Sequence, residues 1–427
     1  MNKSIILSLV AAMGLTFSSE ARELVGLPYA ANNYQLYPED NLPDVTKAPK
    51  GYDIFHIEHY GRHGSRWLIG YQRHDKVISM LERADTLAGG LTPRGREILA
   101  EVKRARKDMQ DREGELSDKG AQQHRGIAHR MAKNFPSVFK KGTYVDARST
   151  VVPRCILSMS NAVSQLSAEV PGLIVTKMDA SEADAPYMKN VIDKPAIKAE
   201  SDALAIYFPE FRNRNRTDGA FLSSLFKKPT EAAAVIDEDA LADNLFEIAA
   251  NSVSTGDQSS IMDIFSPEEL DRIWRLQNAK WFLRSGNTPL TNGLPPMRQR
   301  NLLANIIQSA DTAIVSPNRS ANLRYGHEVI VIPLVVLLEL NDYGKEYTNL
   351  DELAENWRSY EIFPMACNVQ MVFARPAKAK NFNPDDVLVK VLLNEHPAKL
   401  PVPAVDGDYV RWSDLRAHYA KRIGLKN

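Results

Sequence analysis

The order of apolar and polar positions predicts that strands and helices alternate in the first part of the chain. Strands are expected at 52–59 and 142–147, and helices at 76–87, 93–112, 117–134 and 153–166. Two of these helices begin with a hydroxyl cap, because Thr92 stands before Pro93 and Ser117 opens its helix. Alternating strands and helices are typical of an α/β sheet, in which loops at the strand ends carry the chemistry.

The middle of the chain has a different pattern. Between 182 and 296, helical segments such as 231–252 and 267–284 are joined by polar connections, and runs of β-branched residues are few. A helix at 297–310 and apolar strands at 369–374 and 387–393 follow. The expected fold is therefore α/β: a central mixed β-sheet flanked by helices, with an inserted, mostly α-helical cap domain. The expected core comprises residues 22–181 and 297–427, and the expected cap comprises residues 182–296.

The N-terminus has the features of a secretory signal peptide. Lys3 precedes an apolar run at 5–17, and the small residues of Ser19-Glu20-Ala21 suit cleavage near Ala21. The apolar run is too short to span a membrane comfortably, and no cysteine follows it to carry a lipid. We therefore expect residues 1–21 to be removed and the mature chain, without a transmembrane segment, to be periplasmic or extracellular.

Composition narrows the class of partner. The chain is 44% hydrophobic and 25% charged, as in ordinary soluble globular proteins. Its 53 Lys and Arg residues balance 53 Asp and Glu residues, so nothing in the net charge suggests nucleic acid or an acidic membrane surface. An anionic substrate must be held by a local cluster of cations.

Cysteines and histidines give no sign of a metal or another cofactor. Cys155 and Cys367 are the two cysteines, and two buried free thiols are favoured over one bridge. The nine histidines form no cluster with metal-ligand spacing. His124 and His129 fall on a charged helix, where a solvated role is expected.

The strongest chemical signal is Arg62-His63-Gly64-Ser65-Arg66, directly after the first strand. A phosphate dianion needs several rigid cationic donors, and arginine supplies them as forks that stay charged. Flanking positive charge disfavours an imidazolium, so His63 should stay neutral and act as a nucleophile. Gly64 would let the backbone turn and approach the anion.

A second signal lies where a strand gives way to a buried helix. His327 and Glu328 precede the apolar run 329–340. A helix N-terminus favours an anion, so His327 would donate to a phosphate. Glu328 would protonate the leaving oxygen and later deprotonate the attacking water.

Together these segments resemble the histidine acid phosphatases, clade 2 of the histidine phosphatases, and among them the multiple inositol polyphosphate phosphatases and histidine phytases. Residues 62–66 match the family's Arg-His-Gly-x-Arg motif, and Leu116-Ser117 with Gly120 and Gln123 resembles its Leu-Thr-x-x-Gly-x-x-Gln helix start. The segment from Arg148 to Thr150 resembles the one that bears a third phosphate-binding arginine, and residues 365–370 and 389–395 resemble late core strands.

The resemblance implies a phosphomonoesterase that forms a phosphohistidine and needs no metal. His63 would be the nucleophile and Glu328 the proton donor, and the phosphate would be bound by Arg62, Arg66, Arg148 and His327. Here the acid directly follows the histidine, whereas inositol polyphosphate enzymes commonly have His-Ala-Glu. The implied substrates are phytate and other inositol polyphosphates.

A polyphosphorylated ring would need further cations at the pocket rim. Lys189 resembles in position a basic residue of the cap in such enzymes, and other candidates are Arg212, Arg214, Arg216, Lys227 and Lys228. Each of them is also explained by a solvated surface charge. Two alternatives stay open: an acid phosphatase of broad specificity, and a non-catalytic protein that binds a phosphate ligand.

Overall fold

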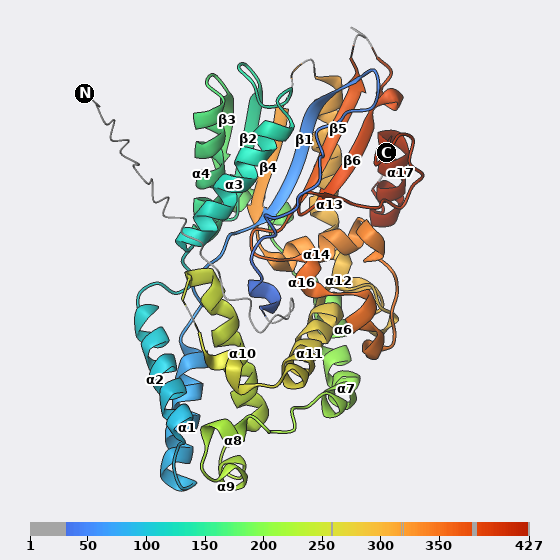
Figure 1. Cartoon of the computed structure of the whole chain (residues 1–427). Coiled ribbons are helices and arrows are strands. Elements are labelled where there is room, and N and C mark those ends of the chain that lie inside the picture. Colours follow the sequence, from blue (N-terminus) through green and yellow to red (C-terminus); the bar gives the residue numbers. More distant parts are fainter. Residues whose placement is uncertain (1–30, 258, 317, 319, 378–381, 426–427) are drawn as a thin grey trace, which may run out of the picture.

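A computed structural model describes residues 31–257, 259–316, 318, 320–377 and 382–425. The expected signal peptide lies outside the described residues. A mixed sheet of eight strands runs through the upper half of the molecule in Figure 1. The strands are β1 (Tyr52–Arg62), β2 (Tyr144–Ser149), β3 (Ile174–Asp179), β4 (Ser320–Gly326), β5 (Asn368–Pro376), β6 (Leu388–Leu393), β7 (His396–Pro397) and β8 (Val410–Arg411).

The strand order is β3-β2-β4-β1-β5-β6-β7, with β8 paired to β6. Strands β1 to β4 are parallel, whereas β5 runs antiparallel to both β1 and β6. This arrangement confirms the predicted mixed sheet. Strand β3 was missed by the pattern, because it lies at the edge and its side chains are largely exposed.

Helices cover both faces of the sheet (Figure 1). On one face, α3 (Asp118–Asn134) and α4 (Pro153–Glu169) share a hydrophobic cluster with inward residues such as Ile57 and Leu323. On the other face, α13 (Arg300–Val315) and α17 (Trp412–Ile423) pack on residues such as Phe373. Successive side chains of a strand point to opposite faces, so the central strands are apolar on both.

The lower half of the molecule in Figure 1 is helical. Its longer helices are α1 (Gln72–Leu87), α2 (Pro93–Asp108), α6 (Lys194–Ile206), α7 (Phe208–Arg214), α10 (Glu238–Thr255) and α11 (Pro267–Ser285). The shorter helices of the chain are α5 (Ala185–Met188), α8 (Leu222–Leu225), α9 (Pro229–Ala233), α12 (Leu294–Met297), α15 (Leu353–Asn356) and α16 (Ser359–Ile362). Between the halves lies α14 (Glu328–Leu337), which begins at the end of β4.

Packing adds one feature to the expected organisation. Helices α1 and α2 share a hydrophobic cluster with α8 and α10, so they belong by packing to the helical half although they precede residue 182. The boundaries 182 and 296 of the inserted cap stay a prediction. Both expected caps are present, since Thr92 accepts from the Gly95 amide and Ser117 from the Gly120 amide.

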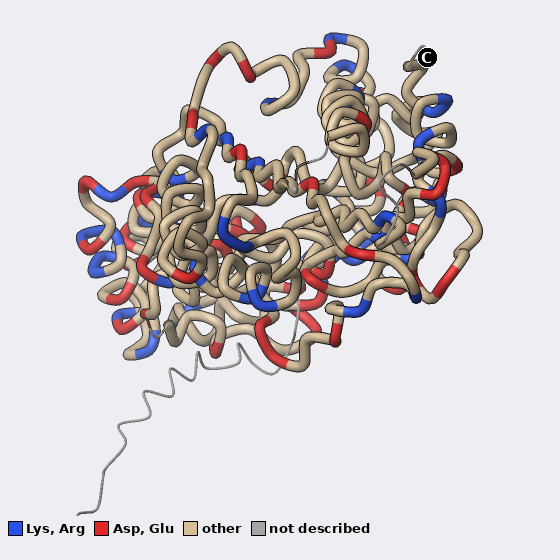
Figure 2. The backbone as a smooth tube through the Cα atoms, turned by 90° about the horizontal axis from the view of Figure 1, so that it is seen from above, with Lys and Arg blue, Asp and Glu red and all other residues tan. Residues whose placement is uncertain are grey.

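Charges of both signs are interspersed around the backbone in Figure 2, as the balanced composition implies. In the described part of the chain, no helix combines the length and the apolar character that a membrane crossing requires.

Candidate active site

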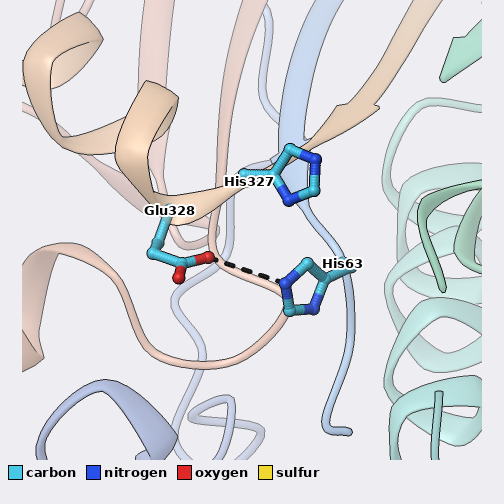
Figure 3. Close-up of side chains that lie close together, drawn as sticks. All are labelled: His63, His327 and Glu328. Atoms are coloured by element: carbon cyan, nitrogen blue, oxygen red, sulfur yellow. Dashed lines mark ion pairs between the residues drawn. The ribbon is translucent and has the colours of Figure 1, made fainter. Parts of the chain in front are cut away.

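The residues singled out by the sequence meet where parallel strands β1 and β4 end. Arg62 pairs in register with Gly326, and the amide of His63 donates to the carbonyl of Gly326 at 2.9 Å. The next residues are His63 on one side and His327 and Glu328 on the other. Figure 3 shows the three side chains converging, with Glu328 on the first turn of α14.

Helix α3 holds the loop that bears His63. A Cβ on Gly64 would lie 2.4 Å from the Gly120 carbonyl oxygen, so the two glycines allow a close approach of two backbones. Gln123 accepts from the Ser65 amide at 2.9 Å, and the Ser117 amide donates to the Ser65 carbonyl. Gly64 therefore serves packing against α3, and the approach of its backbone to an anion stays a prediction.

The hydrogen bond of His63 fixes its tautomer. Its Nδ1 lies 2.9 Å from the carbonyl oxygen of Gly64, and because a carbonyl only accepts, Nδ1 carries the proton. Burial lowers the pKa of His63 well below its ordinary value, and the nearby Arg62 and Arg154 lower it further while Glu328 opposes them. The imidazole is thus neutral with a lone pair on Nε2, mainly because it is buried rather than because arginines flank it.

Glu328 faces both the nucleophile candidate and an arginine. Its Oε2 lies 3.6 Å from His63 Nε2 and 3.2 Å from Arg62 Nε. Burial raises the pKa of Glu328, but the charge of Arg62, with a smaller contribution from Arg66, lowers it by more, to well below its usual range. The carboxyl is therefore ionised in this arrangement and occupies a position suited to an anion.

His327 is oriented by its neighbours. Its Nε2 lies 3.2 Å from the hydroxyl of Thr150, and its ring stands edge-on to that of His63 with centroids 5.6 Å apart. Burial lowers the pKa of His327 to about 4.

The thiol of Cys155 lies beside His327 and donates from Sγ to the carbonyl of Gly326. Cys155 and Cys367 are buried free thiols, the alternative that the sequence favoured.

Arg62 and Arg66 are buried cations with donors to spare. Arg62 donates from Nη1 to the carbonyls of Asn33 and Phe363, but its Nη2 has no hydrogen-bond partner among the described residues. Nε of Arg66 likewise has none among them. Buried charges are costly unless they are paired, so these donors suit an anion.

The structure brings Arg154 to the site instead of Arg148. The guanidinium of Arg148 is bound by Asp146, at 2.8 and 3.0 Å, and by Asp184 and Tyr187. Arg154 lies in the first turn of α4, where burial and then the charge of Arg66 lower its pKa. Its Nε has no hydrogen-bond partner among the described residues. The resemblance had pointed to Arg148, on the strand. The local signal for Arg154 is its position directly after a proline that opens a helix, where the helix dipole attracts anions.

Most of the cations proposed for the rim are paired with acidic residues. Nζ of Lys189 lies 2.8 Å from both carboxylate oxygens of Glu182, and the lysine side chain is 39% exposed. Four other candidates also form ion pairs with acidic neighbours: Arg212, Arg214, Arg216 and Lys228. These contacts are those of solvated surface charges. A substrate role for Lys189 stays a proposal.

The expectation for His124 was wrong, because its side chain is buried. It is 2% exposed, is hydrogen-bonded to the backbone of Arg62 and packs edge-on against Tyr325. Burial lowers its pKa to about 3. His129, on the same helix, is exposed and pairs with Glu169 at 2.7 Å, as a solvated residue does.

His63, His327 and Glu328 also have the composition of a metal site, since one ligand atom from each lies within 4.8 Å of the others. Arg62, Arg66 and Arg154, however, all act on Glu328 or His327 electrostatically. Three guanidinium groups repel a cation and attract an anion. The surroundings of the cluster therefore fit phosphate better than a metal ion.

Comparison with known proteins identifies proteins to which the chain is similar. No family model matches the chain. The chain is 25% identical over 335 residues to "Multiple inositol polyphosphate phosphatase 1" of Homo sapiens, a match that spans 72% of this chain and 66%, just under two thirds, of that protein.

Solved structures share the fold. The multiple inositol polyphosphate phosphatase of Bifidobacterium longum, in complex with phosphate, is 18% identical with a TM-score of 0.72 and covers 93% of this chain and 98% of its own. The same protein in complex with inositol hexasulfate gives a TM-score of 0.69, with 18% identity over 92% of this chain and 97% of that one. The phytase from D. castellii is 13% identical with a TM-score of 0.66 over 99% of this chain and 91% of that one.

The fold is that of the solved multiple inositol polyphosphate phosphatase and phytase structures. Among known proteins, the chain is similar to multiple inositol polyphosphate phosphatases and phytases.

Proposed function

We propose that the chain is an exported, metal-independent phosphomonoesterase that hydrolyses inositol polyphosphates, phytate included, through a phosphohistidine intermediate. One observation carries the proposal: the free Nε2 of a buried, neutral His63 faces the Glu328 carboxyl among buried arginines. A nucleophile, a proton donor and cationic phosphate ligands are the groups that such a reaction needs.

Substrate binding would begin with the arginines. A phosphate dianion would take the spare donors of Arg62, Arg66 and Arg154, with His327 as a further ligand. The anion would then compensate the charges that keep Glu328 ionised. Its own negative charge would raise the pKa of that carboxyl, so Glu328 would take up a proton as the substrate binds.

In the first chemical step, the Nε2 lone pair of His63 forms the N–P bond. The bond between phosphorus and the ester oxygen breaks, its electron pair stays on that oxygen, and the proton of Glu328 is transferred to it. The alcohol leaves, and Glu328 is again a carboxylate.

In the second step, Glu328 takes a proton from a water molecule whose oxygen attacks phosphorus. The N–P bond breaks and its electron pair returns to Nε2, which releases inorganic phosphate and restores His63. Because the carbonyl of Gly64 accepts from Nδ1, Nε2 is the ring nitrogen that takes the phosphoryl group in the first step and releases it in the second.

The names of the relatives support the substrate class. They are multiple inositol polyphosphate phosphatases and phytases, and one of them was crystallised with inositol hexasulfate. Export is proposed on the N-terminal sequence, with Lys3 before an apolar run and a small-residue exit.

A broad acid phosphatase is the second candidate, because the cap cations proposed for the ring are paired with acids on the surface. A non-catalytic binding protein is less favoured. Capture of an anion has no use for a carboxylate that faces the lone pair of an imidazole.

The test is phosphate release from phytate and from a small aryl phosphate, with chelator present. It uses the wild type, His63→Ala and the surface variant His129→Ala as a matched control. Strong preference for phytate, lost only in His63→Ala, supports the proposal. Similar efficiency on both substrates favours the broad phosphatase, and no release from either favours the binding protein.

A further inference from the structure

Helix α10, in the helical half of the molecule, contacts the second arginine of the 62–66 loop. The side-chain amide of Asn251 donates to the backbone carbonyl of Arg66 at 2.9 Å. Glu247 lies one turn earlier on the same helix, so the two side chains share one face. Both are buried, Asn251 at 5% and Glu247 at 9% exposure.

Glu247 forms one side of a small buried network around Arg66. Its Oε2 lies 3.6 Å from Nη2 of Arg73, and its carboxyl is hydrogen-bonded to Tyr34. The ring of Tyr34 in turn lies under Arg66, with 5.5 Å between the guanidinium carbon and the ring centroid. A carboxyl group and a phosphate-binding cation are thus coupled through one aromatic side chain.

The ionisable groups that act on Glu247 come from several elements. They are Tyr34, Arg66, Arg73 of α1 and Asp243 of α10 itself, while α11 contributes the neutral amide of Gln277, which donates to Asp243. Burial is the largest influence and raises the pKa of Glu247. Arg73 opposes it and Asp243 adds to it, and the pKa remains above its ordinary value.

We propose that Glu247 is a positioning residue that controls phosphate binding through Arg66: its ionised form opposes a phosphate dianion on Arg66, and its protonated form favours one. The inference rests on the proposed function, since it takes Arg66 as a phosphate ligand. In chemical terms, the bound dianion and a proton from solvent enter together, and the proton is held on a carboxylate oxygen of Glu247.

The reason is the low dielectric constant of a buried site, in which charges are weakly screened. Two negative charges near one buried guanidinium disfavour each other, so binding of one anion favours neutralisation of the other. The coupling is reciprocal, and protonation of Glu247 strengthens phosphate binding by the factor by which phosphate strengthens protonation. Binding would therefore strengthen as the pH falls, while His63 stays neutral because its own pKa lies well below the ordinary value.

The test is calorimetric titration of inorganic phosphate in two buffers of different ionisation enthalpy, which counts the protons taken up. The variants are Glu247→Gln, Glu247→Asp and Glu328→Gln. Glu238→Gln is the matched control, since Glu238 lies on the first turn of α10 and pairs with exposed Arg216. Protons carried by phosphate itself are common to all variants, so they cancel in the comparison.

We expect Glu247→Gln to take up fewer protons than the wild type and to bind phosphate at pH 7 about three- to tenfold more tightly, as for a pKa coupling of half to one unit. Its affinity should change less with pH, and Glu247→Asp should retain the wild-type trend. With an aryl phosphate at pH 7, KM should fall in Glu247→Gln while kcat is unchanged.

Equal proton uptake in Glu247→Gln and the wild type would overturn the inference. A uniform loss of affinity at every pH would also overturn it, because the carboxyl would then serve only to hold Arg66. In a third outcome, the wild type binds phosphate, and of the variants only Glu328→Gln takes up fewer protons. This result leaves the proposed function intact and rejects the role of Glu247. A wild type that neither binds phosphate nor hydrolyses esters contradicts both.

Discussion

Oε2 of Glu328 lies 3.6 Å from Nε2 of His63, the ring nitrogen with the free lone pair. Glu328 directly follows His327 in the sequence, and its carboxyl nevertheless reaches His63 although no residue separates it from His327. In the same arrangement it lies 3.2 Å from Nε of Arg62. A phosphate bound there would pair with Arg62 in place of Glu328. The pKa of the Glu328 carboxyl would then rise, and the carboxyl could carry a proton.

The first prediction concerns the leaving group. Glu328→Gln cannot donate a proton, so hydrolysis of an ester with an alkyl leaving group should slow by about 10²- to 10⁴-fold, the usual contribution of general acid catalysis. An aryl phosphate whose phenolate leaves without protonation should lose less in the first step. A pre-steady-state burst of phenolate from this ester should persist while the second step is slow. Equal losses for both esters, with no burst, would reject Glu328 as the proton donor.

The second prediction separates two arginines. Arg154→Ala should weaken phosphate binding by roughly 10- to 100-fold, because a charged hydrogen-bond donor contributes about 1.5–3 kcal/mol. Arg148→Ala removes a guanidinium bound to Asp146 and Asp184, so it should lower thermal stability while KM changes by no more than about twofold. Product inhibition by inorganic phosphate and a thermal melt measure the two effects. The reverse pattern would restore Arg148 as the phosphate ligand.

The third prediction concerns metal ions. His63, His327 and Glu328 are close enough to bind one, but the nearby arginines favour an anion. Extended dialysis against chelator should therefore leave kcat/KM unchanged, with elemental analysis as the check that no ion remains. Activity that is lost on chelation and restored by Zn²⁺ would show that the cluster is a metal centre.

Local signals in the sequence predicted those parts of the site that lie close together along the chain. The caps Thr92 and Ser117 accept from amides three residues later in their own helices, and the 62–66 loop directly follows its strand. Contacts over such short distances along the chain can be predicted from the local sequence. Arg154 and His124 depend on packing between distant segments. The sequence gives no distance between α4 and the 62–66 loop, and a charged helix pattern does not reveal that one histidine of α3 is buried.

The same limit applies to Glu247. Its helix was predicted approximately, at 231–252 against the observed α10, but nothing local indicates that one carboxyl of that helix contacts Tyr34 and Arg73. Pairings of this kind depend on how the helical half meets the strand ends. They were accessible only from the three-dimensional structure.

The fourth prediction follows from buried histidines. Burial lowers the pKa of His59 and His124 to about 3 and that of His74 to about 4. Below pH 6.5 the unfolded chain binds protons at these positions and the native chain does not, so stability is lost as the pH falls toward 4. Each group contributes a slope of up to about 1.4 kcal/mol per pH unit.

Urea unfolding of wild type and His124→Gln between pH 7 and pH 4 measures this slope. The variant should show a smaller fall in the free energy of unfolding, whatever its stability at pH 7. His129→Gln, in which an exposed histidine of the same helix is replaced, should keep the wild-type slope. Parallel curves for all three proteins would mean that His124 titrates normally in the native state.

The fifth prediction concerns the ion pair that joins the two strands of the site. Glu58 of β1 and Arg324 of β4 are buried partners, and Glu58 also accepts from Asn322 and Ser309 at 2.7 Å. The two residues are paired because strands β1 and β4 are neighbours in the sheet. The ends of the same two strands bring His63 and His327 together. Burial raises the pKa of Glu58, but Arg324 and His56 lower it to about 2, so the carboxyl is ionised across the working pH range.

Glu58→Gln should destabilise the fold by about 3–5 kcal/mol, because it leaves the Arg324 charge buried without compensation. Replacing both partners, as in Glu58→Gln with Arg324→Met, should recover much of that loss, since no unpaired charge then remains. Glu97→Gln breaks the exposed pair with Arg94 and should cost no more than about 1 kcal/mol. Denaturant unfolding of the four proteins decides the matter: a double variant less stable than Glu58→Gln would mean that shape and hydrogen bonding at Arg324, rather than charge compensation, hold β1 against β4.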